Sequence, residues 1–256
     1  PGAAVQIAAT PRTPGTPHVT LHAVNYGQHI PYEPAAWGAR PPFEHPHPLL
    51  AAALAEIAPP DDLALDIEIA SPIPAGASTG TSAAVTVALL GALDALRPGR
   101  RTAHEIAYAA HRVETVRLGQ QSGIQDQLAS AYGGVSYIEM MRYPHASVSP
   151  IRLAPALRWE LERRLLLVFL GTAHSSSEVH GSVIARLEQE GGASPQLAGL
   201  RHCAALMRDA LYAGDWPALG RAMDANTEFQ RALHPELVSA GAQALIELAR
   251  AHGALG

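Results

Sequence analysis

At residues 71–84 the chain reads Ser-Pro-Ile-Pro-Ala-Gly-Ala-Ser-Thr-Gly-Thr-Ser-Ala-Ala, a loop of small residues between two apolar segments. In the preceding segment, 62–70, apolar and polar residues alternate, which predicts a half-buried strand. The following segment, 82–96, is apolar on nearly every face and predicts a helix packed inside a domain. Gly76 and Gly80 allow close backbone approach, and the first N–H groups of a helix have no internal partner. The loop therefore predicts an anion-binding site.

The loop lacks the residues of other nucleotide-binding motifs. All 18 basic residues of the chain are arginine, so a Walker A lysine is excluded, and Thr81 stands near its place. The Gly-x-Gly-x-x-Gly fingerprint of dinucleotide-binding folds is also absent. Residues 76–80 fit the Gly-x-Ser-x-Gly elbow of α/β-hydrolases with Ser78 as nucleophile, although Pro72 and Pro74 lengthen a turn that an elbow needs to be sharp. A plain turn rich in small residues is the remaining alternative.

Composition narrows the class of protein. The 256 residues are 48% hydrophobic, enough for one large domain or two small ones with a substantial core. A net charge of −5 without any arginine-rich run argues against nucleic acid as a partner. The single cysteine, Cys203, fits a reducing compartment, and we expect a cytoplasmic protein. Because no apolar run approaches about 20 residues, we expect no membrane partner.

The rest of the chain predicts mixed α and β structure. A second strand is expected at 18–25, after strand fragments and turns at 1–17, and the proline-rich segment 31–48 is expected to be irregular. Helices are predicted at about 48–58, 102–118, 175–189, 195–213, 216–232 and 235–252.

Glu114 is the first informative carboxylate. It lies four residues after Ala110, on the apolar stripe of the helix predicted at 102–118. An acid on a buried stripe needs a partner. An ion pair with Arg117 at the helix end would be an ordinary structural explanation, and a ligand for a hard cation such as Mg²⁺ is the functional one.

Asp126 is the second informative carboxylate. It follows the polar glycine turn at 118–124 and opens a short helix before Gly133 and Gly134. Ser122 as a helix cap and Asp126 as a first-turn acid would explain this pattern structurally. Two acids close to a phosphate-type loop also make a coherent kinase site.

These segments resemble the GHMP kinase superfamily, which includes galactokinase, homoserine kinase and mevalonate kinase. The loop at 71–84 is similar to its Pro-x-x-x-Gly-Leu-x-Ser-Ser-Ala phosphate loop. The Ser-Gly-Ile-Gln-Asp-Gln segment at 122–127, with the glycine pair at 133–134, is similar to the sugar-kinase branch, above all D-glycero-D-manno-heptose 7-phosphate kinases. Residues 165–177 resemble that branch's strand, its Thr-Gly turn and the small polar run that follows. The resemblance implies an α+β fold of two domains, a nucleotide-binding part at 1–160 similar to ribosomal protein S5 and a helix-rich part at 161–256.

The resemblance also implies the chemistry and its residues. ATP is the implied donor, Mg²⁺ the implied metal ion, and a sugar or sugar phosphate the implied acceptor, with the anomeric hydroxyl of heptose 7-phosphate as the best single guess. Ser82 and Glu114 match residues that hold Mg²⁺, and Asp126 matches the catalytic base. The implied nucleotide-binding residues are Pro74, Gly76, Ala77, Ser78, Thr79, Gly80, Thr81 and Ser82, and the implied substrate-binding residues are Ser122, Gly123, Gln125 and His174.

The chain departs from the family in several places. The family's Gly-Leu is Ser78-Thr79 here, and His174 stands where heptose kinases have arginine, which leaves galactose, fucose or a uronic acid open as acceptors. A serine hydrolase using Ser78 and a nucleotide-binding protein without catalysis are the alternatives of other classes. The family's N-terminal motif is not seen before Pro1, and its last glycine-rich motif would begin after Gly256. We therefore expect a truncated part of a longer kinase.

Overall fold

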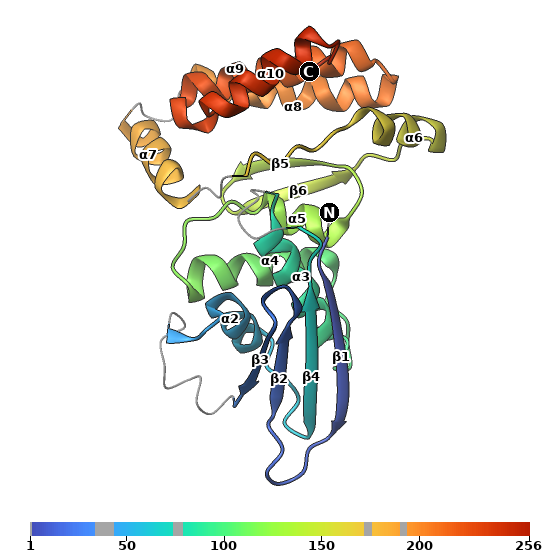
Figure 1. Cartoon of the computed structure of the whole chain (residues 1–256), viewed down its shortest axis with the longest axis vertical. Coiled ribbons are helices and arrows are strands. Elements are labelled where there is room, and N and C mark those ends of the chain that lie inside the picture. Colours follow the sequence, from blue (N-terminus) through green and yellow to red (C-terminus); the bar gives the residue numbers. More distant parts are fainter. Residues whose placement is uncertain (1, 34–43, 74–78, 172–175, 190–193) are drawn as a thin grey trace. The chain divides into compact units, whose positions relative to one another are not determined.

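The computed structural model describes residues 2–33, 44–73, 79–171, 176–189 and 194–256. The chain divides into two compact units, Pro1–Val148 and Ser149–Gly256. The architecture is α+β, as predicted (Figure 1). The described elements of the first unit are β1 (Ala4–Pro11), β2 (Val19–Ala23), η1 (Val24–Tyr26), β3 (Gln28–Tyr32), α2 (Pro48–Glu56), β4 (Leu63–Ala70), α3 (Thr81–Asp94), α4 (Ala103–Arg112), η3 (Val113–Arg117), α5 (Gln125–Tyr132), β5 (Ser136–Arg142) and β6 (His145–Pro150).

A four-stranded sheet organises the first unit. Its strand order is β1-β4-β2-β3, with β4 antiparallel to β1 and parallel to β2. Along β4, Leu65, Ile67 and Ile69 are buried whereas Asp66 and Glu68 are exposed, so the predicted alternation is confirmed. Residue Leu21 of β2 lies opposite Ile67 in the parallel ladder, and both are buried. The two central strands therefore carry the apolar face of the sheet.

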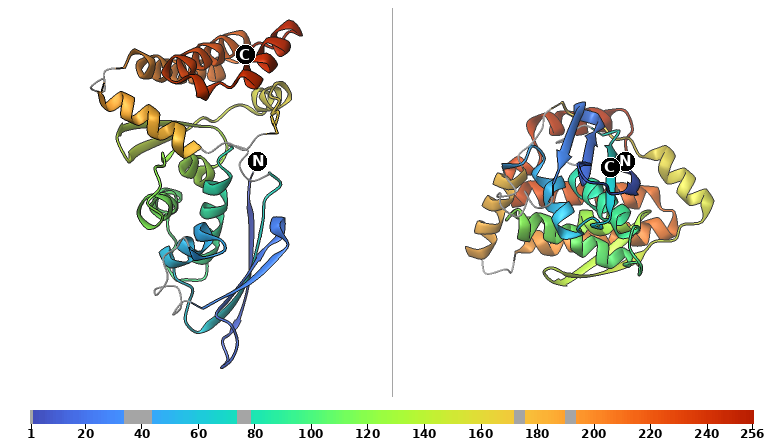
Figure 2. Two further views of the ribbon diagram at one scale, coloured as in Figure 1. Left: turned by 60° about the vertical axis from the view of Figure 1, so that its left-hand side comes forward. Right: turned by 90° about the horizontal axis from the view of Figure 1, so that it is seen from below.

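Helices α2, α3 and α4 supply the second layer of this unit. The left view of Figure 2 shows the strands on one side and these helices on the other. Their buried side chains form one core cluster with those of the sheet. Helix α3, predicted at 82–96 and observed at Thr81–Asp94, also packs against α4 and α5, which explains why it is apolar on most faces.

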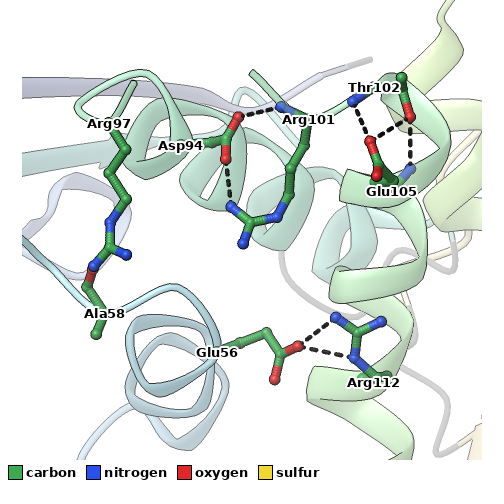
Figure 3. Close-up of polar contacts among 8 residues, drawn as sticks. All are labelled: Glu56, Ala58, Asp94, Arg97, Arg101, Thr102, Glu105 and Arg112. Atoms are coloured by element: carbon green, nitrogen blue, oxygen red, sulfur yellow. Dashed lines mark hydrogen bonds and ion pairs between the residues drawn. The ribbon is translucent and has the colours of Figure 1, made fainter. Parts of the chain in front are cut away.

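Polar contacts fix the ends of these helices (Figure 3). Buried Asp94, the last residue of α3, accepts hydrogen bonds from the backbone and the guanidinium of Arg101. Burial alone would raise the pKa of Asp94, but the hydrogen bonds and charge of Arg101 outweigh it, so the pKa is lowered. Thr102 and Glu105 form a capping box at the start of α4.

Glu56 ties α2 to the end of the α4 segment. Its carboxylate accepts from Arg112 Nε at 2.9 Å and from Arg117 Nε at 2.7 Å. Burial would raise the pKa of Glu56, but the hydrogen bonds from Arg117 and Arg112 lower it further than burial raises it. These contacts hold the segment that carries Glu114 against the rest of the unit.

The second unit is mainly helical. Its described helices are α6 (Pro155–Arg164), α7 (Ser176–Gln189), α8 (Pro195–Ala213), α9 (Trp216–Leu233), η4 (Pro235–Leu237) and α10 (Ala240–Ala251). Helices α8 and α9 pack against each other, and Asp215 caps α9 by accepting from the Ala218 N–H at 2.9 Å. None of the helices in the described ranges has the length and apolar character needed to cross a membrane.

The prediction of a strand at the start of residues 165–177 is wrong. Residues 165–170 have no regular structure, and Leu166 is 86% exposed. A strand needs a neighbour for its backbone N–H and C=O groups. Neither sheet of the described residues, β1-β4-β2-β3 or β5-β6, includes this segment.

Candidate functional site

The start of α3 presents free backbone N–H groups. Gly80 is the N-cap residue and has φ 69° and ψ 26°, in the left-handed region that favours glycine. Because glycine has no side chain to cap the helix, the N–H groups of the first turn, which includes Thr81 and Ser82, stay available. The helix dipole adds partial positive charge at this end. The start of α3 therefore offers backbone N–H groups of the kind that bind anions, and the anion site stays a prediction.

Asp126 lies directly against Gly80. An added Cβ at Gly80 would stand 3.1 Å from Asp126 Cγ and 3.2 Å from its Oδ2. Asp126 is exposed in the first turn of α5, the helix that packs against both α3 and α4. The fold thus brings the second predicted carboxylate to the phosphate-type loop, 46 residues away in sequence.

The side chain of Asn25, in η1, fixes the first residue of the loop, Ser71. Asn25 Nδ2 donates to the Ser71 carbonyl at 2.6 Å, and the Ser71 N–H donates to Asn25 Oδ1 at 2.8 Å. This pair of bonds ties the end of β4 to η1, which follows the parallel strand β2. The loop therefore leaves the sheet from a defined position.

A cavity of about 430 Å³ opens beside the start of α3. Its lining is mainly apolar and comes from η1, from the start of α2, from the end of β4 and from the first turn of α3. Thr81 and Ser82 lie on its wall, and exposed Tyr26 and half-buried His47 line it with ring centroids 5.4 Å apart. His47 Nε2 also forms a hydrogen bond with Gln28 Oε1 at 2.7 Å. A cavity of this size and character suits a flat, partly apolar small-molecule group.

Glu114 lies in a helical turn of a different kind from the α-helix predicted at 102–118. After α4 ends at Arg112, residues 113–117 form a π-helical turn, closed by the Leu118 N–H donating to the Val113 carbonyl at 3.1 Å. Turns of this type often occur at functional sites. Glu114 is only 5% exposed there.

The carboxylate of Glu114 is held by two neutral donors. Ser122 Oγ donates to Glu114 Oε2 at 2.5 Å, and Gln127 Nε2 donates to the same oxygen at 2.8 Å. The alternative of a pair with Arg117 is not formed, because Arg117 binds Glu56. Ser122 does not cap α5 either, since Ile124 is the N-cap residue.

The other oxygen of Glu114 fits a cation. Glu114 Oε1 is buried and has no hydrogen-bond partner among the described residues. Such an orphaned carboxylate oxygen is a suitable ligand for Mg²⁺, which prefers one or two carboxylates together with water and phosphate oxygens. Within the described ranges no group of three His, Cys, Asp or Glu side chains could hold a metal ion by itself. A site here would therefore need oxygen atoms from a bound nucleotide.

Two side chains, His111 and Tyr143, contact the turn between Glu114 and Asp126. His111 Nε2 lies 3.2 Å from the Ser122 carbonyl and 3.0 Å from Tyr143 Oη, and Tyr143 Oη donates to the same carbonyl at 3.0 Å. The side chain of exposed Gln125 lies over Gly123, and its amide end would have to move to admit a Cβ there.

The structure describes only part of the predicted site. Pro74, Gly76, Ala77, Ser78 and His174 lie outside the described residues. Thr79 is described, and its Oγ1 lies 3.2 Å from Thr81 Oγ1. Sequence patterns gave no indication of His111, Tyr143, Asn25 or Tyr26, which reach the site through contacts distant in sequence. Gln127 belongs to the quoted segment at 122–127, but the sequence assigned it no role.

Comparison with known proteins identifies the family of part of the chain. Residues 49–134 match the family described as GHMP kinases N terminal domain. A D-glycero-alpha-D-manno-heptose 7-phosphate kinase of Campylobacter jejuni is 26% identical over 159 residues, which cover 62% of this chain and 47% of that protein. A mevalonate kinase of Pyrococcus horikoshii is 34% identical over 125 residues, 49% of this chain and 33% of that protein. The chain thus spans about half the length of the first relative and about a third of the second.

Solved structures support the fold. The crystal structure of L. major mevalonate kinase in complex with R-mevalonate superimposes with a TM-score of 0.67 at 21% identity, covering 99% of this chain and 72% of that one. This likeness shows a GHMP kinase fold. The family resemblance inferred from the loop and from residues 122–127 is confirmed, and residues 49–134 are identified as a GHMP kinase N-terminal domain.

Proposed function

We propose that this chain is the part of an ATP- and Mg²⁺-dependent small-molecule kinase that holds the nucleotide and the catalytic carboxylate. The observation that carries the proposal is the contact of Asp126 with Gly80, at the uncapped start of α3. It puts a carboxylate beside the backbone N–H groups that suit a phosphate. The nucleophile elbow would instead use Ser78, which lies outside the described residues.

The nucleotide has a natural place in the cavity beside α3. In this proposal its phosphates lie at the N–H groups of residues 81–83, and Ser82 contributes a hydroxyl. The base occupies the apolar part of the cavity, where the exposed ring of Tyr26 is available for stacking. The absence of lysine fits this arrangement, since backbone groups and the helix dipole supply the positive potential.

The two carboxylates take different parts in the proposed reaction. Glu114 Oε1 and the Ser82 hydroxyl would hold Mg²⁺, which would offset negative charge on the phosphate oxygens of the bound nucleotide. Asp126 accepts the proton of the acceptor hydroxyl as that oxygen forms a bond to the γ-phosphorus. The bond from the γ-phosphorus to the bridging oxygen of ADP breaks in the same transfer. Most of the rate enhancement comes from positioning and charge stabilisation.

The acceptor is proposed to be a sugar or sugar phosphate. The Campylobacter jejuni relative carries the name of a heptose 7-phosphate kinase, which supports the anomeric hydroxyl of heptose 7-phosphate as the first candidate. Galactose, fucose and uronic acids stay open because His174 replaces an expected arginine. Mevalonate is the candidate from a different class, because several relatives are named mevalonate kinases. The single cysteine, Cys203, is buried and fits the proposed cytoplasmic location.

An ADP-release screen tests the proposal. Hexoses, heptoses, their phosphates and mevalonate are each offered with Mg²⁺ and ATP, and one class should give acceptor-dependent ADP. Asp126→Asn should then lower that turnover by about 10²-fold or more while nucleotide affinity, measured with a fluorescent ATP analogue, stays close to that of the wild type.

Asp61→Asn is the matched control, because Asp61 is an exposed carboxylate before β4, at the other end of the strand from the loop. It should keep wild-type turnover. Undiminished turnover in Asp126→Asn would refute the base assignment. ATP binding without turnover on any acceptor would favour a nucleotide-binding protein, and labelling of Ser78 by a fluorophosphonate would favour the hydrolase.

A further inference from the structure

The buried cluster around Glu114 has an asymmetric hydrogen-bond pattern. Both described donors to its carboxylate, Ser122 Oγ and Gln127 Nε2, end on Oε2. Oε1 is buried without a donor in the described part of the chain. Two convergent bonds on one oxygen fix the rotation of a carboxylate, and the second oxygen then points in one direction only.

The orientation of the Gln127 amide is determined by this contact. Gln127 is 1% exposed, and its Nε2 also lies 3.5 Å from Ser122 Oγ. Turning the amide over would put Gln127 Oε1 against the carboxylate of Glu114, where two acceptors would repel each other. Gln127 Oε1 consequently has no hydrogen-bond partner among the described residues. A buried acceptor without a donor costs stability.

The neutrality of both donors matters for the charge of the cluster. An arginine in place of Gln127 would neutralise Glu114 and compete with a cation for it. An amide and a hydroxyl orient the carboxylate and leave its negative charge in place. Hydrogen-bonding groups that do not bind the metal themselves commonly orient metal-binding carboxylates.

Helix α5 links this cluster to the other carboxylate. Successive residues of an α-helix point about 100° apart. Asp126 is exposed and faces Gly80, whereas Gln127 is buried and faces Glu114. One short helix therefore positions both acids, one directly and the other through an amide.

We propose that Gln127, together with Ser122, is a positioning residue that holds Glu114 with Oε1 directed at the cation of the bound nucleotide. This inference rests on the proposed function and names a residue that neither the sequence pattern nor the family motif assigns to metal binding. Its specific consequence is a loss of cation affinity when the amide donor is removed, without a loss of metal-free nucleotide binding.

The test is Gln127→Met, which keeps the length and approximate volume of the side chain and removes the donor. Mn²⁺ affinity is measured by electron paramagnetic resonance with a non-hydrolysable ATP analogue present, and analogue binding is measured separately in EDTA. We expect Mn²⁺ affinity to fall about 10–100-fold, the range found when groups that hydrogen-bond to metal ligands are removed. Binding of the analogue in EDTA should stay unchanged. Gln121→Met, at an exposed glutamine of the same turn, is the matched control and should bind Mn²⁺ like the wild type.

The outcomes separate this inference from the proposed function. A folded Gln127→Met protein with wild-type Mn²⁺ affinity would refute the inference alone. Wild-type protein that binds neither the analogue nor Mn²⁺ would refute the proposed function and the inference with it. If Gln127→Met does not fold, Ser122→Ala removes the other donor at a half-buried position, and a Mn²⁺ affinity equal to that of the wild type would also refute the inference.

Discussion

Gly80→Ala tests whether the close approach of the α3 start to Asp126 matters for activity. The substitution adds one methyl group, and its carbon would stand 3.1 Å from Asp126 Cγ and 3.3 Å from Asp126 Cβ. Comfortable carbon–carbon contacts begin at about 3.5 Å, so the Asp126 carboxylate must retreat by roughly 0.5 Å. A misplacement of about 1 Å can cost 10²-fold in rate, so we expect turnover to fall about 10-fold.

The same substitution carries a separate backbone cost. Gly80 has φ +69°, and a residue with a Cβ pays about 1–2 kcal/mol in that region. For a unit of this size that corresponds to a drop of about 3–6 °C in melting temperature. Gly99→Ala is the control for this cost, because Gly99 has φ +80° and no atom within 4 Å of an added Cβ. It should lower the melting temperature similarly and leave turnover per folded molecule unchanged.

The assay is acceptor-dependent ADP release, corrected for the folded fraction by circular dichroism at the same temperature. Combining Gly80→Ala with Asp126→Asn adds a sharper criterion. If the methyl group acts through Asp126, it should cost little further activity once that carboxylate is gone. The reasoning fails if Gly80→Ala turns over like the wild type, if Gly99→Ala loses as much activity, or if the two site changes combine additively.

Two further predictions concern charged groups of the first unit. Glu114→Gln should raise the Mg²⁺ concentration needed for half-maximal turnover by about 10-fold or more, and an unchanged Mg²⁺ dependence in a kinetic titration would contradict its metal role. Asp94→Asn should lower the free energy of unfolding by about 1–3 kcal/mol at pH 7, since Arg101 loses its charged acceptor. Because the pKa of Asp94 is lowered in the fold, this difference is fully present above the ordinary value of 3.8 and shrinks as the pH falls below it. A difference independent of pH in urea titrations would refute that assignment.

The local patterns of the chain were sufficient for the main elements of the first unit. The alternation along 62–70 and the apolar stretch after Gly80 correspond to β4 and α3, and the capping box fixes the start of α4 at Thr102. These features depend on neighbouring residues, which a single sequence displays directly. The two carboxylates were recognisable because an acid on a buried stripe or beside a glycine turn needs an explanation.

Contacts between distant residues were not predictable in the same way. The bonds between Asn25 and Ser71 join residues 46 positions apart, and nothing in either local pattern indicates the pairing. The buried position of Gln127 follows from the packing of α5 on α4 rather than from its own polarity. At 165–170 the resemblance to a family strand was misleading, because a run of apolar residues with strand propensity forms no strand without a neighbour.

The π-helical turn at 113–117 has a consequence for how related sequences should be aligned. A π-helical turn contains one residue more than an α-helical turn. The residues before and after it can therefore face the same sides of the helix as in a chain without the extra residue. Glu114 and Asp126 are twelve residues apart here. A related chain with a regular α-helix at this point could present the same two carboxylates with one residue fewer between them. A search pattern with a fixed interval would miss such chains, whereas one that allows a single gap after Glu114 would find them.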